Sequence, residues 1–236
     1  MPTDDALASP TVDEIFTAFL DEQRARLAPR TFANYETIIE LFADCLNGYG
    51  HQSLDDDERE RLEPAYDAGD EDAFVHLFGA EKIVENLSEF LGYFMVRKVM
   101  AGQELLKAAG TVTKKLTKYL ASQGLIGTNE AAVAADRASD AARDLPKAER
   151  LGSMLYDQTL ASRHMDVDDV PGGDWVEDSL FIYRVEGRRI WFEGDIGPLE
   201  VSAEAARLAQ PGWQVTVTMA KLKGKWHLLE VGNVYP

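Results

Sequence analysis

The sequence predicts an α+β protein with an α-helical N-terminal domain, a helical connector and a small C-terminal β-barrel. Two changes of pattern along the 236 residues support this. Up to residue 126, apolar residues recur at spacings of three and four, as on the buried face of a helix. From residue 175, apolar and polar residues alternate over short segments bounded by glycine, which indicates strands. The expected divisions are a disordered tail at 1–10, the helical domain at 11–126, the connector and linker at 127–172, and the barrel at 173–236.

The first two helices have recognisable boundaries. Thr11, with Glu14 three residues later, forms a capping-box pattern that predicts a helix start. Pro29 is expected to lie in the break before the second helix. Thr31 is expected to cap that helix, and Gly48 and Gly50 are expected to end it.

The remaining helical elements are expected in the following order. Residues 53–72 are rich in Asp and Glu and predict a solvated helix and loop. A helix at 111–123 would be capped by Thr111 and stopped by Gly124. Other helices are predicted at 73–78, 81–100, 103–109, 129–143 and 147–160.

The C-terminal region predicts about five short strands. Alternating segments lie within 180–192, at 213–219 and at 226–231, and residues 202–210 predict a short helix between them. Five strands in some 60 residues are typical of a small barrel of the SH3-like or OB-like kind. The boundary is placed in the polar segment 163–174, which contains Pro171-Gly172-Gly173. We therefore expect residues 173–236 to fold alone.

The chain is strongly acidic, with 41 Asp and Glu against 24 Lys and Arg and a net charge of −17. A salt-rich cytoplasm is one interpretation of this composition, and ordinary solubility is the alternative. With Cys45 as its one cysteine, the chain cannot form an internal disulfide. The sequence shows neither a signal-peptide pattern nor an apolar run of about 18 residues, so a cytoplasmic protein without membrane contact is expected.

One segment reverses this charge. Residues 92–124 contain six basic residues against Glu104 alone. On the predicted helix 111–123, Lys114, Lys115 and Lys118 share one face, and no acidic residue interrupts them. A segregated basic face suits contact with a DNA backbone, although a solvated helix face is the ordinary alternative.

A family resemblance covers about residues 11–126. The stretch Pro29-Arg30-Thr31-Phe32-Ala33-Asn34-Tyr35 and the later step Gly124-Leu125-Ile126 resemble the core-binding, SAM-like domain of phage integrases, the tyrosine recombinases. In that family the domain forms half of a clamp around duplex DNA. The resemblance therefore implies a double-stranded DNA partner and an accessory or regulatory role in DNA recombination or integration.

The same resemblance argues against catalysis. The family's catalytic domain carries a tyrosine nucleophile, arginines and a His-x-x-Arg element, and none of the four histidines here begins such an element. Cys45 lies on an apolar helix and is interpreted as a buried hydrophobe rather than a nucleophile. We therefore expect no enzyme activity, no catalytic residues, no cofactor and no metal.

A second resemblance competes over the lysine segment. Residues 111–116, followed by Gly124-Leu125-Ile126, are similar to the recognition helix and wing entry of winged-helix transcriptional regulators. Residues 103–109 would then form the preceding helix, with the turn at Gly110-Thr111. This resemblance implies that Thr113, Lys114 and Lys118 face the major groove.

The sequence thus predicts two sets of residues that contact nucleic acid, and it leaves one competing function open. Lysines flanking Gly224 at an expected hairpin tip are candidates for a second contact with phosphate, or else protect a strand edge. The competing function is a protein–protein adaptor that acts through the barrel. The predicted DNA-binding residues are Arg97, Lys98, Lys107, Thr113, Lys114, Lys115 and Lys118, and the second-contact residues are Lys221, Lys223 and Lys225.

Overall fold

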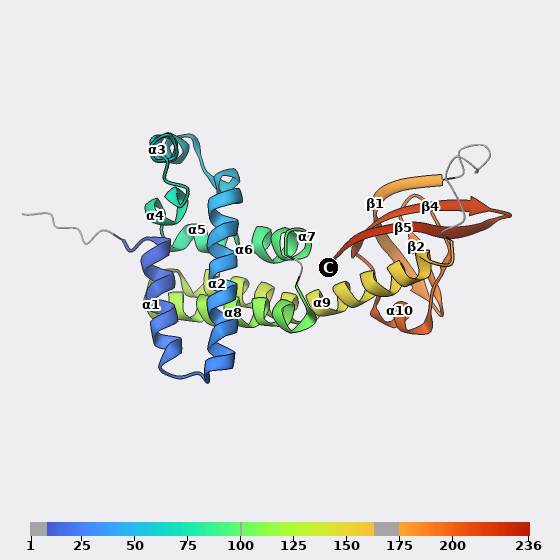
Figure 1. Cartoon of the computed structure of the whole chain (residues 1–236), viewed down its shortest axis with the longest axis horizontal. Helices are drawn as coiled ribbons and strands as arrows, with labels where there is room; N and C mark the ends of the chain where they lie inside the picture. Colours follow the sequence, from blue (N-terminus) through green and yellow to red (C-terminus); the bar gives the residue numbers. More distant parts are fainter. Residues whose placement is uncertain (1–8, 100, 163–174) are drawn as a thin grey trace, which may run out of the picture. The chain divides into compact units, whose positions relative to one another are not determined.

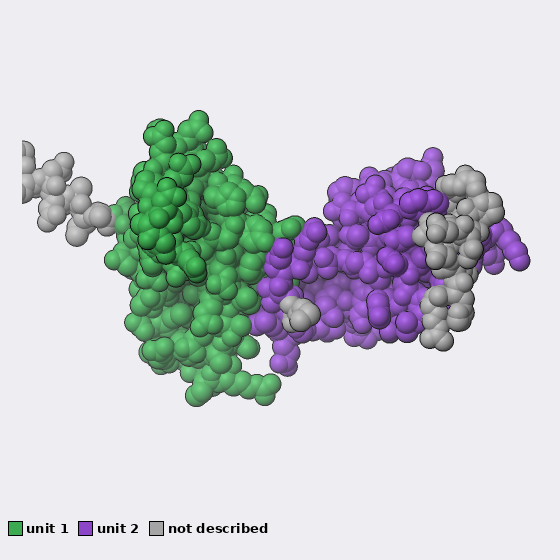
Figure 2. Space-filling view, turned by 45° about the horizontal axis from the view of Figure 1, so that its top comes forward, with its two compact units in different colours: residues 1–95, 107–142 green, residues 96–106, 143–236 purple. Residues whose placement is uncertain are grey.

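The computed structural model describes residues 9–99, 101–162 and 175–236 (Figure 1). It confirms the α+β class, with a helical N-terminal region followed by a five-stranded mixed sheet. The chain divides into two compact units (Figure 2). The first consists of residues 1–95 and 107–142, and the second of residues 96–106 and 143–236. No helix of the described residues is long and apolar enough to cross a bilayer.

The first helix begins where the sequence predicts, and the second begins earlier. Helix α1 (Val12–Arg24) has the capping box of Thr11 and Glu14. Helix α2 (Pro29–Tyr49) starts at Pro29 itself, because proline suits the first helical turn, where its missing N–H has no partner to lose. The predicted cap at Thr31 is therefore wrong. Gly48 lies inside the helix, and the predicted stop is confirmed at Gly50, which is the C-cap.

The acidic region forms a capped helix, and the long helix predicted after it is interrupted. Helix α3 (Asp56–Asp67) begins with a capping box of Asp55 and Glu58. The prediction of one helix over 81–100 is wrong, since a π-helical segment, η2, breaks the helical hydrogen-bond pattern. The other elements are η1 (Gly50–Ser53), α4 (Ala73–Leu77), α5 (Ala80–Glu85), α6 (Leu87–Glu89), η2 (Phe90–Phe94) and α7 (Met95–Arg97).

Aromatic side chains hold the first unit together. The Phe42 ring stacks on Phe90 at 4.3 Å between centroids and lies 5.7 Å from Phe16. Phe19 of α1 contacts Tyr119 of α8 (Gln103–Ser122), with ring centroids 5.5 Å apart. The later helix is thereby fixed against the first one.

Helix α8 is continuous, so the predicted break between 103–109 and 111–123 is wrong. Gly110 lies inside it, where a β-carbon would come within 2.3 Å of the Ala142 nitrogen and 2.5 Å of the Ala138 oxygen. Those atoms belong to helix α9 (Thr128–Thr159). Glycine is present because two helix backbones approach closely there, rather than because the chain turns.

Helix α9 is also continuous, although two helices are predicted over 129–143 and 147–160. It passes through Pro146 without ending. Beyond that proline, Ala148, Leu151 and Leu155 are buried in the same hydrophobic cluster as the inner residues of the sheet. The end of the connector is thus part of the hydrophobic core of the sheet.

The C-terminal strands pair in the order β1-β2-β3-β5-β4, and β4 returns to β1, which closes the sheet. The β3–β5 pair is parallel and the other pairs are antiparallel. Helix α10 (Ala203–Leu208), capped by Ser202, lies between β3 and β4 in sequence and confirms the predicted short helix. The strands are β1 (Trp175–Glu186), β2 (Arg189–Phe192), β3 (Leu199–Glu200), β4 (Gln214–Leu222) and β5 (Lys225–Tyr235).

The predicted hairpin tip around Gly224 is confirmed. Lys223 and Gly224 form a two-residue turn in which both φ angles are positive, at 51° and 77°, the combination that two-residue hairpins favour. The turn sets the register in which Lys221 pairs with Trp226, and Leu222 with Lys225.

Candidate nucleic-acid interface

Four lysines of α8 form a basic surface, the lysine face: Lys107, Lys114, Lys115 and Lys118. Three of them are exposed and Lys114 is half-buried. Within the described part of the chain, none of the four has an ion-pair partner. At a helical rise of about 1.5 Å per residue, the eleven steps from Lys107 to Lys118 span roughly 16 Å.

Packing of the opposite side of α8 keeps this face in solvent. Val112, Leu116 and Leu120 are at most 1% exposed and lie in the core. Because side chains one turn apart share a helix face, burial of these residues directs the lysines outward. The helix presents cations without mixing in carboxylates along residues 107–122.

The structure removes Thr113 from the predicted DNA contacts. Its side chain is fully buried, and its hydroxyl donates to the Ala109 carbonyl oxygen at 2.7 Å. A hydroxyl buried in this way cannot reach a base. With residues 110 and 111 inside a helix, the turn that the winged-helix resemblance requires is also absent from α8.

Arg97 and Lys98 are exposed as well, but they belong to the second compact unit, whereas Lys107 to Lys118 belong to the first. Each of the two also makes a polar or electrostatic contact within the chain. The six basic residues of this segment therefore divide between the two units. The lysine face alone is the candidate site of the first unit.

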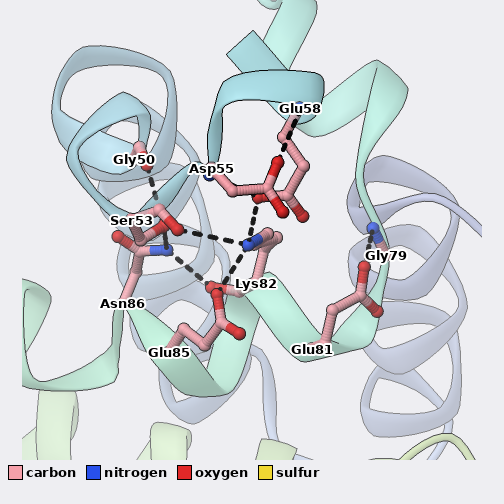
Figure 3. Close-up of polar contacts among 9 residues, drawn as sticks. All are labelled: Gly50, Ser53, Asp55, Glu58, Gly79, Glu81, Lys82, Glu85 and Asn86. Atoms are coloured by element: carbon pink, nitrogen blue, oxygen red, sulfur yellow. Dashed lines mark hydrogen bonds and ion pairs between the residues drawn. The ribbon is translucent and has the colours of Figure 1, made fainter. Parts of the chain in front are cut away.

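Lys82 differs from these lysines, because it is buried and its charge is paired within the protein (Figure 3). Its side chain is 5% exposed, and its Nζ lies 2.7 Å from Glu58 Oε2 and 2.8 Å from Glu85 Oε2. It also donates to the Ser53 carbonyl oxygen at 3.2 Å. Burial alone would lower the pKa of Lys82, but the hydrogen bonds that its ammonium group donates to the two glutamates, together with their negative charges, outweigh burial and raise that pKa. The lysine face makes no such contacts, so its charges remain available to a ligand.

The barrel carries a second basic surface that the sequence shows only in part. Lys221, Lys223 and Lys225 are exposed at the β4–β5 turn, as predicted. Arg188 and Arg189 were missed, because they lie more than 30 residues earlier in the chain. The parallel pairing of Leu199 with Trp226, together with the pairing of Arg189 with Glu200, brings β2 and β3 near the β4–β5 hairpin. Lateral strand pairing of this kind leaves no mark in local sequence.

Cys45 is 1% exposed, which confirms its interpretation as a buried hydrophobe. Burial, with Glu89 and Asp44 nearby, raises the pKa of its thiol to about 12. A thiol with that pKa supplies almost no thiolate at neutral pH, and the thiolate is the reactive form.

Comparisons of the chain with protein-family models, curated proteins and solved structures found no match.

Proposed function

We propose that this chain is a non-catalytic protein that binds double-stranded DNA, related to the integrase core-binding domain and accessory or regulatory in DNA recombination or integration. The observation that carries the proposal is the lysine face: four cations on one helix of a chain with a net charge of −17, with no ion-pair partner among the residues that the structure describes. At long range, so acidic a protein and DNA repel each other electrostatically. A cluster of this kind therefore points to direct phosphate contacts, which act at short range.

The local features that carry the family resemblance suit this proposal. The Pro-Arg-Thr start coincides with the first turn of α2, and Gly124 follows α8 with a positive φ of 71°. A glycine in that conformation is a common helix stop. Both features agree with a SAM-like helical domain.

For the C-terminal unit we propose the OB-like member of the two barrel types. A closed order of five strands, with one parallel pair and a helix between β3 and β4, suits a five-stranded Greek-key barrel. Because one fold supports many functions, this assignment adds nothing by itself to the case for DNA.

The proposal is tested by fluorescence anisotropy with a labelled random 24-base-pair duplex at two salt concentrations. If three or four phosphates are contacted, log K falls against log salt with a slope of about −2.7 to −3.6. Supercoiled plasmid incubated with the protein, with and without magnesium, should keep its topology. Absence of duplex binding at low salt would contradict the proposal, and nicking that copurifies with the protein would contradict its non-catalytic part.

A protein–protein adaptor is the second candidate, favoured by two aromatic residues on β1. Phe181 is 46% exposed and Tyr183, at a β-bulge, is 72% exposed. Large exposed aromatics are enriched where proteins bind one another. The salt titration separates the candidates, because an adaptor has no reason to bind random duplex.

A further inference from the structure

Two adjoining hollows form a groove on the outside of the closed sheet. One, of about 440 Å³, is lined by residues 186–189 with Glu200 and Val201. The other, of about 480 Å³, runs past Pro198 to the β4–β5 turn and the end of α9. Arg189 and Glu200 line both hollows, so the two hollows adjoin at this pair. The groove therefore reaches from the β1–β2 turn to the β4–β5 turn, and all of its walls belong to the second unit.

The groove and its rim are basic in an otherwise acidic chain. Arg188, Arg189 and Lys225 line it, and Lys221 and Lys223 stand beside it on the same hairpin. Its acidic lining residues are Glu186 and Glu200, and Glu200 faces Arg189 with 3.8 Å between the charged atoms. Both members of that pair are more than half exposed, so their attraction is weak and the arginine can turn to another anion.

Aromatic rings accompany these cations. Trp226 lines the groove, and the Lys221 Nζ lies 6.0 Å from the centre of its ring. Trp191 lies on the outer face of β2 together with Arg189, because Ile190 and Phe192 between and beyond them point into the core. The Arg184 guanidinium covers the Trp191 ring at 4.2 Å. Planar rings next to exposed cations are what unpaired nucleic-acid bases and their phosphates require.

From this arrangement we infer that the groove binds single-stranded nucleic acid, a ligand distinct from the duplex proposed for the lysine face. Arg188, Arg189 and Lys225 contact consecutive phosphates, and an unpaired base stacks on Trp226. A duplex cannot use such a ring, since its bases already stack on one another. The inference rests on these side chains rather than on the type of barrel.

The test measures binding of fluorescein-labelled (dT)12, the matching (U)12 and a 12-base-pair duplex, with tryptophan fluorescence as a second readout. Arg189→Gln/Lys225→Gln removes two contacts that each contribute about 0.7 to the salt slope, so the slope falls by about 1.4 and affinity at 0.1 M salt drops about 25-fold. Glu200→Gln tightens binding, because it removes repulsion and frees Arg189. A variant that merely unfolds cannot produce that gain.

The matched control is Arg59→Gln/Arg207→Gln, which makes the same change of charge at exposed positions outside the groove. All measurements are repeated in the Lys114→Ala/Lys115→Ala/Lys118→Ala background, so that failure of the lysine face and failure of the groove are seen separately. Preference for (dT)12 or for (U)12 identifies the natural strand, and either supports the inference. Equal effects of test and control variants, no preference over duplex, or displacement of the strand by poly-glutamate each overturns it.

Discussion

The end of α9 is expected to be indispensable for folding of the barrel. Leu151 and Leu155 are 0% exposed and belong to the hydrophobic cluster of the sheet. A buried Leu→Ala change costs about 2–5 kcal/mol, so the double variant loses roughly 4–10 kcal/mol of unfolding free energy. A domain has only about 5–15 kcal/mol in total. Residues 173–236 alone lack both leucines and should not fold, contrary to the expectation from sequence, whereas residues 143–236 should fold.

Urea denaturation followed by tryptophan fluorescence measures this directly, because all four tryptophans, Trp175, Trp191, Trp213 and Trp226, lie in the second unit. Leu160→Ala is the matched control, since that side chain is 51% exposed and its loss should change stability by no more than about 0.5 kcal/mol. A 173–236 fragment that unfolds cooperatively at the same urea midpoint as 143–236 would refute the reasoning.

Three further changes test the first unit, each by thermal or chemical melts. Gly110→Ala should lower the free energy of unfolding by about 3 kcal/mol or more, because the new methyl group meets backbone atoms of α9 at 2.3 Å. Gly48→Ala is the control and should stabilise slightly, because nothing lies near its added methyl group. Equal effects of the two changes would contradict the close helix crossing. Lys82→Ala should cost roughly 3 kcal/mol, because it leaves Glu58 and Glu85 without their cation, against almost nothing for exposed Ser88→Ala. The hydrogen bond that the His76 ring donates to the Asp70 carboxylate raises the pKa of His76. The stabilisation from this pair is therefore complete below the unfolded value of 6.5 and is lost as pH rises through the raised pKa. His76→Gln should therefore lower Tm at pH 6 and leave it unchanged at pH 9, and a Tm loss of equal size at both pH values contradicts this.

Much of the fold could be predicted from local pattern. The Thr11–Glu14 box, the strands, α10 and the hairpin at Gly224 depend on residues close in sequence, and the structure confirms them. The errors arise where distant packing overrides a local signal. Glycine and proline usually mark a break in a helix. Gly110 instead lies where α8 crosses α9, and Pro146 lies inside α9, whose later residues are buried in the hydrophobic cluster of the sheet.

The candidate sites divide in the same way. Helical periodicity predicts that Lys114, Lys115 and Lys118 share a face. Lys107 joins them only because α8 continues through Gly110, which the sequence did not predict. The prediction for Thr113 is wrong because periodicity gave no warning that its side of α8 is also buried, where its hydroxyl donates to the Ala109 carbonyl oxygen. The groove could not be predicted at all, since Arg189 and Lys225 are brought near one another only by strand closure.

The salt dependence of duplex binding by Lys114→Ala/Lys115→Ala/Lys118→Ala tests the central claim most directly. Three lost phosphate contacts lower the slope by about 2.7, which is about 500-fold in affinity at 0.1 M salt and almost nothing near 1 M. Its control, Arg26→Ala/Arg59→Ala/Arg207→Ala, removes three exposed charges elsewhere and should leave the slope unchanged. Both triple variants should keep Tm within a few degrees. A lysine variant whose affinity and slope equal those of the wild type would contradict the account and favour the adaptor.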